Sequence, residues 1–103
     1  MTYNISISET AEMEMKSISD YISDVLHSPQ SAYNLMREMQ KQIRALNQMP
    51  KRYPLVFDER LAKMGIRSMP VKNYSIFYIV SEQENTVTII SVMYNRRDWA
   101  NLL

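Results

Sequence analysis

Two runs of β-branched and aromatic residues in the C-terminal half constrain the fold of this chain most strongly. Residues 73–81 and 86–93 are rich in Ile, Val, Thr, Tyr and Phe, and the polar sequence Glu82-Gln83-Glu84-Asn85 separates them. Such residues suit a pleated, half-buried surface, and a short polar segment between two such runs is typical of a hairpin. The pattern predicts two antiparallel strands, preceded by a third over residues 65–69 that starts at the only glycine.

The N-terminal half predicts one strand and two amphipathic helices. Alternating apolar residues at positions 3, 5 and 7 indicate a short strand, and Ser8 is placed to cap a helix over residues 9–26. Ser28 and Pro29 suit the start of a second helix, which Pro50 ends near Met49. Both helices carry apolar residues every three or four positions, namely Ala11, Met15, Ile18, Ile22 and Val25 in the first and Ala32, Leu35, Met36, Met39, Ile43 and Leu46 in the second.

The predicted order is strand, helix, helix, strand, strand, strand. Because few residues join the two helices, we expect an α+β fold in which an antiparallel helical hairpin packs on a small, mainly antiparallel sheet. With 103 residues, the chain is expected to form a single domain over residues 1–103. The methionines at helical spacing, including Met13, are expected to fill the core. Residues 51–60 show too little periodicity for a helix and are expected to form a loop.

Charge is divided unevenly along the chain. Residues 1–36 carry one cation and five acids, a net −4, whereas residues 37–103 carry eleven cations and six acids, a net +5. A two-ended molecule of this kind is suited to an anionic target or a complementary partner, although two solvated faces would give the same division. Without cysteine, and with His27 as the only imidazole, we expect no metal site and no cofactor.

The chain also lacks the features of membrane and secreted proteins. No apolar run approaches the ~20 residues needed to span a bilayer, and the N-terminus has no basic segment followed by an apolar run. We therefore expect a cytoplasmic protein without membrane contact.

Three segments of the chain together match one known pattern. They are the stretch from Asp20-Tyr21-Ile22 to Pro50, the pair Ile66-Arg67-Ser68-Met69-Pro70-Val71 and Tyr74-Ser75-Ile76-Phe77-Tyr78, and the ending Val92-Met93-Tyr94-Asn95-Arg96-Arg97-Asp98-Trp99. In this order they resemble the helical hairpin, the central strands and the last strand with its tail in the RelE/ParE superfamily of bacterial toxins from type II toxin–antitoxin modules. This resemblance covers nearly the whole chain. It implies a growth-arresting toxin, of the kind associated with plasmid stabilisation, that a cognate antitoxin neutralises. It also implies that operator DNA is bound only through the toxin–antitoxin complex.

The superfamily resemblance implies two alternative mechanisms. RelE-like members cleave messenger RNA on the ribosome, which requires a base for the 2′-hydroxyl, cations for the phosphorane and an acid for the leaving oxygen. ParE-like members are described as gyrase inhibitors without nuclease chemistry. Ser75 stands where most relatives carry arginine, no histidine lies near the C-terminus, and the ending from Asn95 to Trp99 looks ParE-like. We therefore favour inhibition of DNA gyrase, with an mRNA interferase as the alternative.

The candidate site residues are mostly cations of the second half. The residues expected to be catalytic, if the chain is a ribonuclease, are Arg67, Tyr94, Arg96 and Arg97. The residues expected to bind the target or a nucleic acid are Lys51, Arg52, Arg60 and Lys72. Arg67 and Arg97 could instead pair with Glu59 and Asp98 as surface ions, which are worth little energetically, so for either arginine alone a structural role weighs as much as a functional one. Only their clustering favours function.

Overall fold

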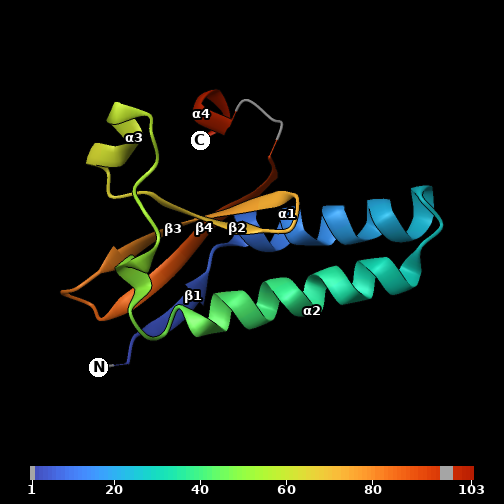
Figure 1. Ribbon diagram of the computed structural model, residues 1–103, viewed down its shortest axis with the longest axis horizontal. Coiled ribbons are helices and arrows are strands. Elements are labelled where there is room, and N and C mark those ends of the chain that lie inside the picture. Colours follow the sequence, from blue (N-terminus) through green and yellow to red (C-terminus); the bar gives the residue numbers. More distant parts are fainter. Residues whose placement is uncertain (1, 96–98) are drawn as a thin grey trace.

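A computed structural model describes residues 2–95 and 99–103 of the chain, and a four-stranded sheet lies at its centre (Figure 1). The strands are β1 (Asn4–Ile7), β2 (Arg67–Val71), β3 (Tyr74–Ser81) and β4 (Thr86–Tyr94), in the spatial order β1-β4-β3-β2. The β1 strand pairs with β4 in parallel, and the other two pairs are antiparallel. The sheet is therefore mixed and mainly antiparallel, as predicted.

Two long helices form an antiparallel hairpin on one face of the sheet. The first, α1 (Glu9–Asp20), continues into a π-helical segment, η1 (Tyr21–Val25), and the second is α2 (Pro29–Ala45). The Ser8 hydroxyl caps α1 by accepting a hydrogen bond from the Ala11 N–H at 3.1 Å. It also donates to the Ile90 carbonyl at 3.2 Å, which ties the start of the helix to β4. The predicted cap at Ser8 is therefore confirmed.

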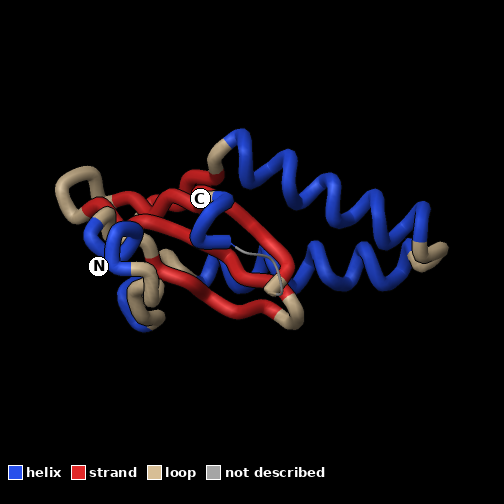
Figure 2. The backbone as a smooth tube through the Cα atoms, turned by 90° about the horizontal axis from the view of Figure 1, so that it is seen from above, coloured by secondary structure: helices blue, strands red, loops and turns tan. Residues whose placement is uncertain are grey.

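The sheet separates two apolar clusters. Residues of α1 and α2 pack on one face against alternate strand residues such as Ile76, Tyr78 and Ile89. The opposite face carries a smaller cluster around Leu61 and Phe77, covered by the short helices α3 (Glu59–Lys63) and α4 (Trp99–Leu102) (Figure 1). Seen from above, the far end of the helical hairpin extends beyond the strands (Figure 2). The far end of the hairpin therefore has no strand beneath it.

Several predicted boundaries were wrong. The second helix stops at Ala45, because Pro50 has no N–H to donate to the Leu46 carbonyl and its ring would clash with that carbonyl in a continued helix. Met49 adopts a left-handed φ of 49° before the 3-10 turn η2 (Pro50–Arg52). The Ser28 side chain does not cap α2 and bonds instead to Ser31 at 2.6 Å. The segment expected to be a loop contains η2 and the start of α3, which the Asp58 carboxylate caps.

The expected core also differed at the overhang. Met15 and Met39 are buried as predicted, whereas the Met13 side chain is 63% exposed, and Val25, on the predicted stripe, is exposed as well. Val25 is the last residue of η1, at the far end of the hairpin, which extends beyond the strands (Figure 2), and Met13 lines a hollow along the side of α1. The periodicity of a helix shows which residues share a face, but it does not show how far the sheet extends under that face.

Candidate functional site

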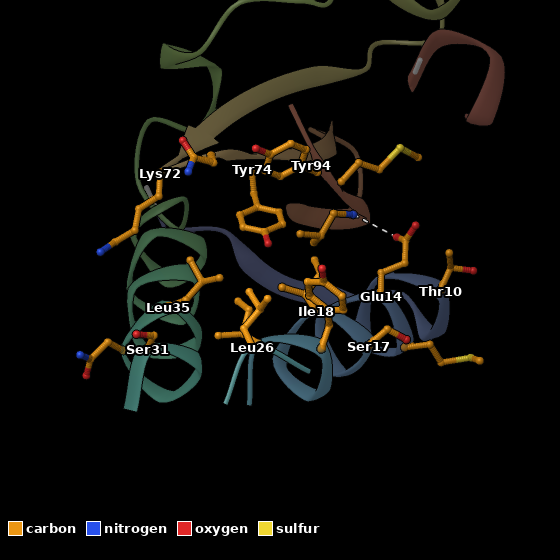
Figure 3. A pocket seen from close by; sticks show the side chains of 17 residues that line it. Thr10, Glu14, Ser17, Ile18, Leu26, Ser31, Leu35, Lys72, Tyr74 and Tyr94 are labelled. Carbon is orange, nitrogen blue, oxygen red and sulfur yellow. Dashed lines mark hydrogen bonds between the residues drawn. The ribbon is translucent and has the colours of Figure 1, made fainter. Parts of the chain in front are cut away.

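A groove of about 1140 Å³ opens along the flank of the hairpin (Figure 3). Residues of α1, η1 and α2 form one wall, and the turn between β2 and β3 together with the end of β4 forms the other. The apolar and aromatic side chains that line it include Met13, Ile18, Tyr21, Leu26, Leu35, Tyr74 and Tyr94. Three of them, Met13, Tyr21 and Leu26, are more than half exposed. A concave surface that leaves large apolar groups in water is suited to binding a partner.

Glu14 connects the two walls of the groove. Its Oε1 accepts a hydrogen bond from the Val92 N–H at 3.0 Å, drawn in Figure 3, and another from the Ser91 hydroxyl at 2.9 Å. The β1 strand ends at Ile7, opposite Ile89, so the later part of β4 has no neighbouring strand on that side among the described residues. A backbone N–H on such an edge requires an acceptor, and Glu14 supplies it. The carboxylate therefore has a structural role that fixes α1 to the end of β4.

Tyrosines form the floor and the rim. Tyr74 and Tyr94 occupy paired positions on β3 and β4, and their rings meet edge to face with centroids 5.5 Å apart. Burial raises the pKa of Tyr74 above its ordinary value, and the nearby Tyr94 and Tyr21 hydroxyls raise it further. The Tyr74 hydroxyl therefore stays protonated at neutral pH and can donate a hydrogen bond to a bound partner. A tyrosine in this state is not suited to act as a general base.

The turn between β2 and β3 gives the groove its cationic edge. Lys72 adopts a left-handed φ of 53° in this turn, an uncommon conformation for a residue with a side chain. The neighbouring strand end holds the turn in place, because the Asn95 N–H donates to the Asn73 carbonyl at 2.9 Å and the Ser75 hydroxyl donates to the Asn95 side chain at 2.5 Å. Lys72, one of the predicted binding residues, is therefore presented at the rim.

The structure does not bring the described candidate catalytic residues together. Tyr94 lies in the groove opposite Tyr74, whereas Arg67 pairs with Tyr78. The two pairing positions are four residues apart on β3, a separation of roughly 13 Å along the strand. Arg96 and Arg97, the other two candidates, lie outside the described residues.

Three of the predicted cationic residues hold the η2 segment against the sheet. The Arg67 guanidinium donates to the carbonyls of Lys51 at 3.3 Å and Tyr53 at 2.7 Å. Arg52 donates to the Ala45 and Gln48 carbonyls, which lie near the end of α2, and its guanidinium stacks on the Tyr53 ring at 5.4 Å. The Lys51 ammonium contacts Glu82 at 2.6 Å and lowers the pKa of that carboxyl. These contacts give the cluster a structural role.

A buried tyrosine completes the same anchor. The Tyr78 hydroxyl donates to the Pro50 carbonyl at 2.6 Å, and burial raises its pKa to about 12. The fourth predicted binding residue, Arg60, lies elsewhere, on α3, and donates to the Ala100 carbonyl at 3.3 Å. The predicted cations thus fall into separate places on the molecule, and of those that the structure describes only Lys72 lines the groove.

Sequence analysis did not single out Glu14 or Tyr21 as groove residues. An exposed aromatic at the end of an amphipathic stripe is a weak signal, and the partners of Glu14 lie 77 and 78 residues away in the chain. Within residues 2–95 and 99–103, no three His, Cys, Asp or Glu residues are grouped so that they could hold a metal ion. In the same part of the chain, no helix is long and apolar enough to cross a membrane.

Solved structures share this architecture. A chromosomal ParDE toxin–antitoxin system from P. aeruginosa aligns with a TM-score of 0.74 at 15% identity, over 90% of this chain and 96% of that chain. The E. coli toxin RelE in the free state, solved as a double arginine-to-alanine mutant, aligns with a TM-score of 0.66 at 15% identity, over 99% of this chain and 93% of that chain. The RelBE2 toxin–antitoxin complex of Mycobacterium tuberculosis aligns with a TM-score of 0.63 at 17% identity, over 91% of this chain and 92% of that chain. No curated protein sequence matches the chain.

The fold, a helical hairpin packed on a mixed four-stranded sheet, is therefore RelE/ParE-like. A family model described as the ParE toxin of the type II toxin–antitoxin system parDE matches residues 5–99. This protein belongs to that family of toxins, which confirms the superfamily that the sequence indicated.

Proposed function

We propose that this toxin arrests growth by inhibiting DNA gyrase in the cytoplasm, and that a cognate antitoxin neutralises it by placing an amphipathic helix in the groove. The observation that carries the antitoxin proposal is the groove itself, whose wall leaves Met13, Tyr21 and Leu26 in water. Burial of this apolar area favours association, and helices commonly dock in grooves of this kind. The P. aeruginosa and M. tuberculosis structures that share the fold are toxin–antitoxin systems, which supports the same kind of partner.

The charges around the groove favour an acidic antitoxin. Lys72 stands at the rim and forms no salt bridge among the described residues, whereas the Glu14 carboxylate is already engaged by Ser91 and Val92. A carboxylate on the antitoxin helix would meet Lys72 as its apolar face met the tyrosines. The net +5 of residues 37–103 adds a longer-range attraction to an acidic chain.

Tyr21 and Tyr33 offer a matched pair for testing this interface. Both are exposed, at 53% and 58%, but only Tyr21 lines the groove. We expect Tyr21→Ala to weaken binding of the antitoxin encoded beside the toxin by about 10- to 100-fold, because interface tyrosines are often hot spots. Tyr33→Ala should leave that affinity unchanged. Equal effects of the two variants in titration calorimetry would contradict the assignment of the groove, and failure of the neighbouring gene product to bind would contradict the antitoxin proposal.

The family match to ParE and the separation of Arg67 from Tyr94 support gyrase rather than messenger RNA as the target. RNA cleavage requires proton carriers and cations around one phosphate, and Arg67 already donates to two backbone carbonyls. Induction in cells without antitoxin tests the target. We expect DNA replication to stop first, with DNA damage and filamentous cells, while protein synthesis continues. An immediate stop of translation would favour the ribosome-dependent endoribonuclease.

A further inference from the structure

The outward face of α2 carries a row of cations that lies outside the groove of the proposed function. Arg37, Lys41 and Arg44 are all exposed and recur at intervals of four and three residues, with the exposed Tyr33 one turn before them. We call these four residues the basic stripe. The stripe lies on the side of α2 opposite its buried residues, which are Ala32, Leu35, Met39 and Ile43. In Figure 1, α2 forms the outer layer of the molecule, so no described element covers this side.

The cations of the basic stripe are free of acidic partners among the described residues. The salt bridges there involve Lys16, Lys51 and Lys63 and none of the stripe cations. Instead, the Arg37 guanidinium stacks over the Tyr33 ring at 5.8 Å, and the Arg44 Nε donates to the Gln40 carbonyl one turn earlier. These local contacts hold the arginines along the helix. Glu38 is the one acidic residue beside the stripe in the hollow that its cations line, so this surface keeps a net positive charge. The stripe is therefore a preformed surface for an anionic partner.

The dimensions of the stripe match a nucleic acid backbone. Seven residues separate Arg37 from Arg44, so the cations extend over about 10 Å of helix axis. Successive phosphates of one DNA strand advance by about 3.4 Å along the duplex axis, so a row of this length laid along that axis spans about three of them. An exposed α-helix can lie between the phosphate rows that border the major groove of B-form DNA, which is about 12 Å wide, whereas the deep major groove of A-form RNA is too narrow to admit one.

We propose that the basic stripe of α2 binds the sugar–phosphate backbone of duplex DNA. This inference goes beyond the proposed function, because the stripe faces away from the groove and would bind DNA without gyrase or antitoxin. Contacts to phosphate carry no sequence information, so binding is expected to be non-specific and strongly dependent on salt. For a toxin directed at an enzyme of DNA, such contacts would keep it close to its target.

The experiment compares two double variants of the full chain with the same net charge. Arg37→Gln/Lys41→Gln removes two stripe cations, and Lys16→Gln/Lys63→Gln removes two cations from other helices. Glutamine keeps high helix propensity, and the circular dichroism of each variant checks the fold. Fluorescence anisotropy with a short duplex DNA of mixed sequence, over a series of salt concentrations, measures affinity. We expect the stripe variant to bind DNA more weakly by about 10-fold or more. The slope of log binding constant against log salt concentration should become shallower by about 1.8, because each of the two lost phosphate contacts contributes about 0.9.

The control variant should bind nearly as well as the unmodified chain. Equal loss in both variants would show that only net charge matters and would overturn the proposal. Absence of DNA binding by the unmodified chain at low salt, or tighter binding to duplex RNA of the same sequence, would overturn it as well. Antitoxin affinity and gyrase inhibition are measured separately on the same variants, so failure of the DNA proposal is distinguishable from failure of the proposed function.

Discussion

Replacing Glu14 tests how the groove is held together. The change Glu14→Ala removes the acceptor of two hydrogen bonds, one from the Val92 N–H and one from the Ser91 hydroxyl, whose residue is only 3% exposed. Hydrogen bonds to charged groups contribute about 1.5–3 kcal/mol each, and an unsatisfied buried donor costs about 1–3 kcal/mol. The Ser91 hydroxyl can rotate toward another acceptor, but the backbone N–H cannot. We therefore expect the free energy of unfolding to fall by about 2–4 kcal/mol.

Urea denaturation measures this loss directly, and thermal denaturation should show a Tm lower by roughly 10–20 °C. Glu12→Ala is the matched control, because Glu12 lies exposed on the same helix and only its favourable position near the helix N-terminus is lost, about 0.3–1 kcal/mol. Glu14→Gln keeps one acceptor oxygen and should lose about half as much as Glu14→Ala. Ordinary surface substitutions change the free energy of unfolding by up to about 0.5 kcal/mol. If the free energy of unfolding of Glu14→Ala stayed within that range of the unmodified protein, the carboxylate would not hold α1 to β4.

Two further predictions concern the core and its pH dependence. Met39→Ala should lower the free energy of unfolding by about 2–5 kcal/mol, because Met39 is fully buried. Met13→Ala should change that free energy by less than about 0.5 kcal/mol, because the Met13 side chain is exposed. Similar losses in the two variants would refute the assignment of Met13 to the groove surface. The pKa of Tyr78 is raised to about 12 in the folded protein, against 10.0 ordinarily. Because the unfolded chain ionises at lower pH than the folded one, the protonated Tyr78 contributes its full stabilisation below pH 10, and this contribution is lost as the pH rises toward 12. Tyr78→Phe should be less stable at neutral pH, by about 0.5–1.5 kcal/mol, and should show a shallower decline between pH 10 and 12; parallel pH profiles would contradict this.

Most of the fold was predictable because its elements have strong local signals. The β-branched and aromatic residues of the C-terminal runs, with the polar turn between them, marked β3 and β4, and Ser8 and Pro29 marked the starts of the two long helices. The short α3 was missed because five residues are too few for a helical period to show, although Asp58 was available as its cap. The left-handed φ of Met49 was not predictable either, because the residue before a proline normally adopts an extended conformation.

The groove was much less predictable, because it depends on where distant segments stop. Its open flank exists because β1 ends opposite Ile89 while β4 continues to Tyr94, a register that no local pattern encodes. The same gap explains why Glu14 bonds to Val92. Arg67 was assigned a role that its contacts do not support. In the sequence, a cation at a strand suggested catalysis, but in the structure the Arg67 guanidinium donates to the Lys51 and Tyr53 carbonyls.

The target is tested most directly with purified components. We expect the toxin to inhibit supercoiling of relaxed plasmid by DNA gyrase, and the cognate antitoxin to restore it, while messenger RNA bound to ribosomes stays intact in the presence of the same toxin. Arg67→Ala should then reduce inhibition only as far as it loosens the η2 segment. Cleavage of ribosome-bound messenger RNA, abolished in a folded Arg67→Ala variant while supercoiling proceeds normally, would contradict the account and identify the protein as an mRNA interferase.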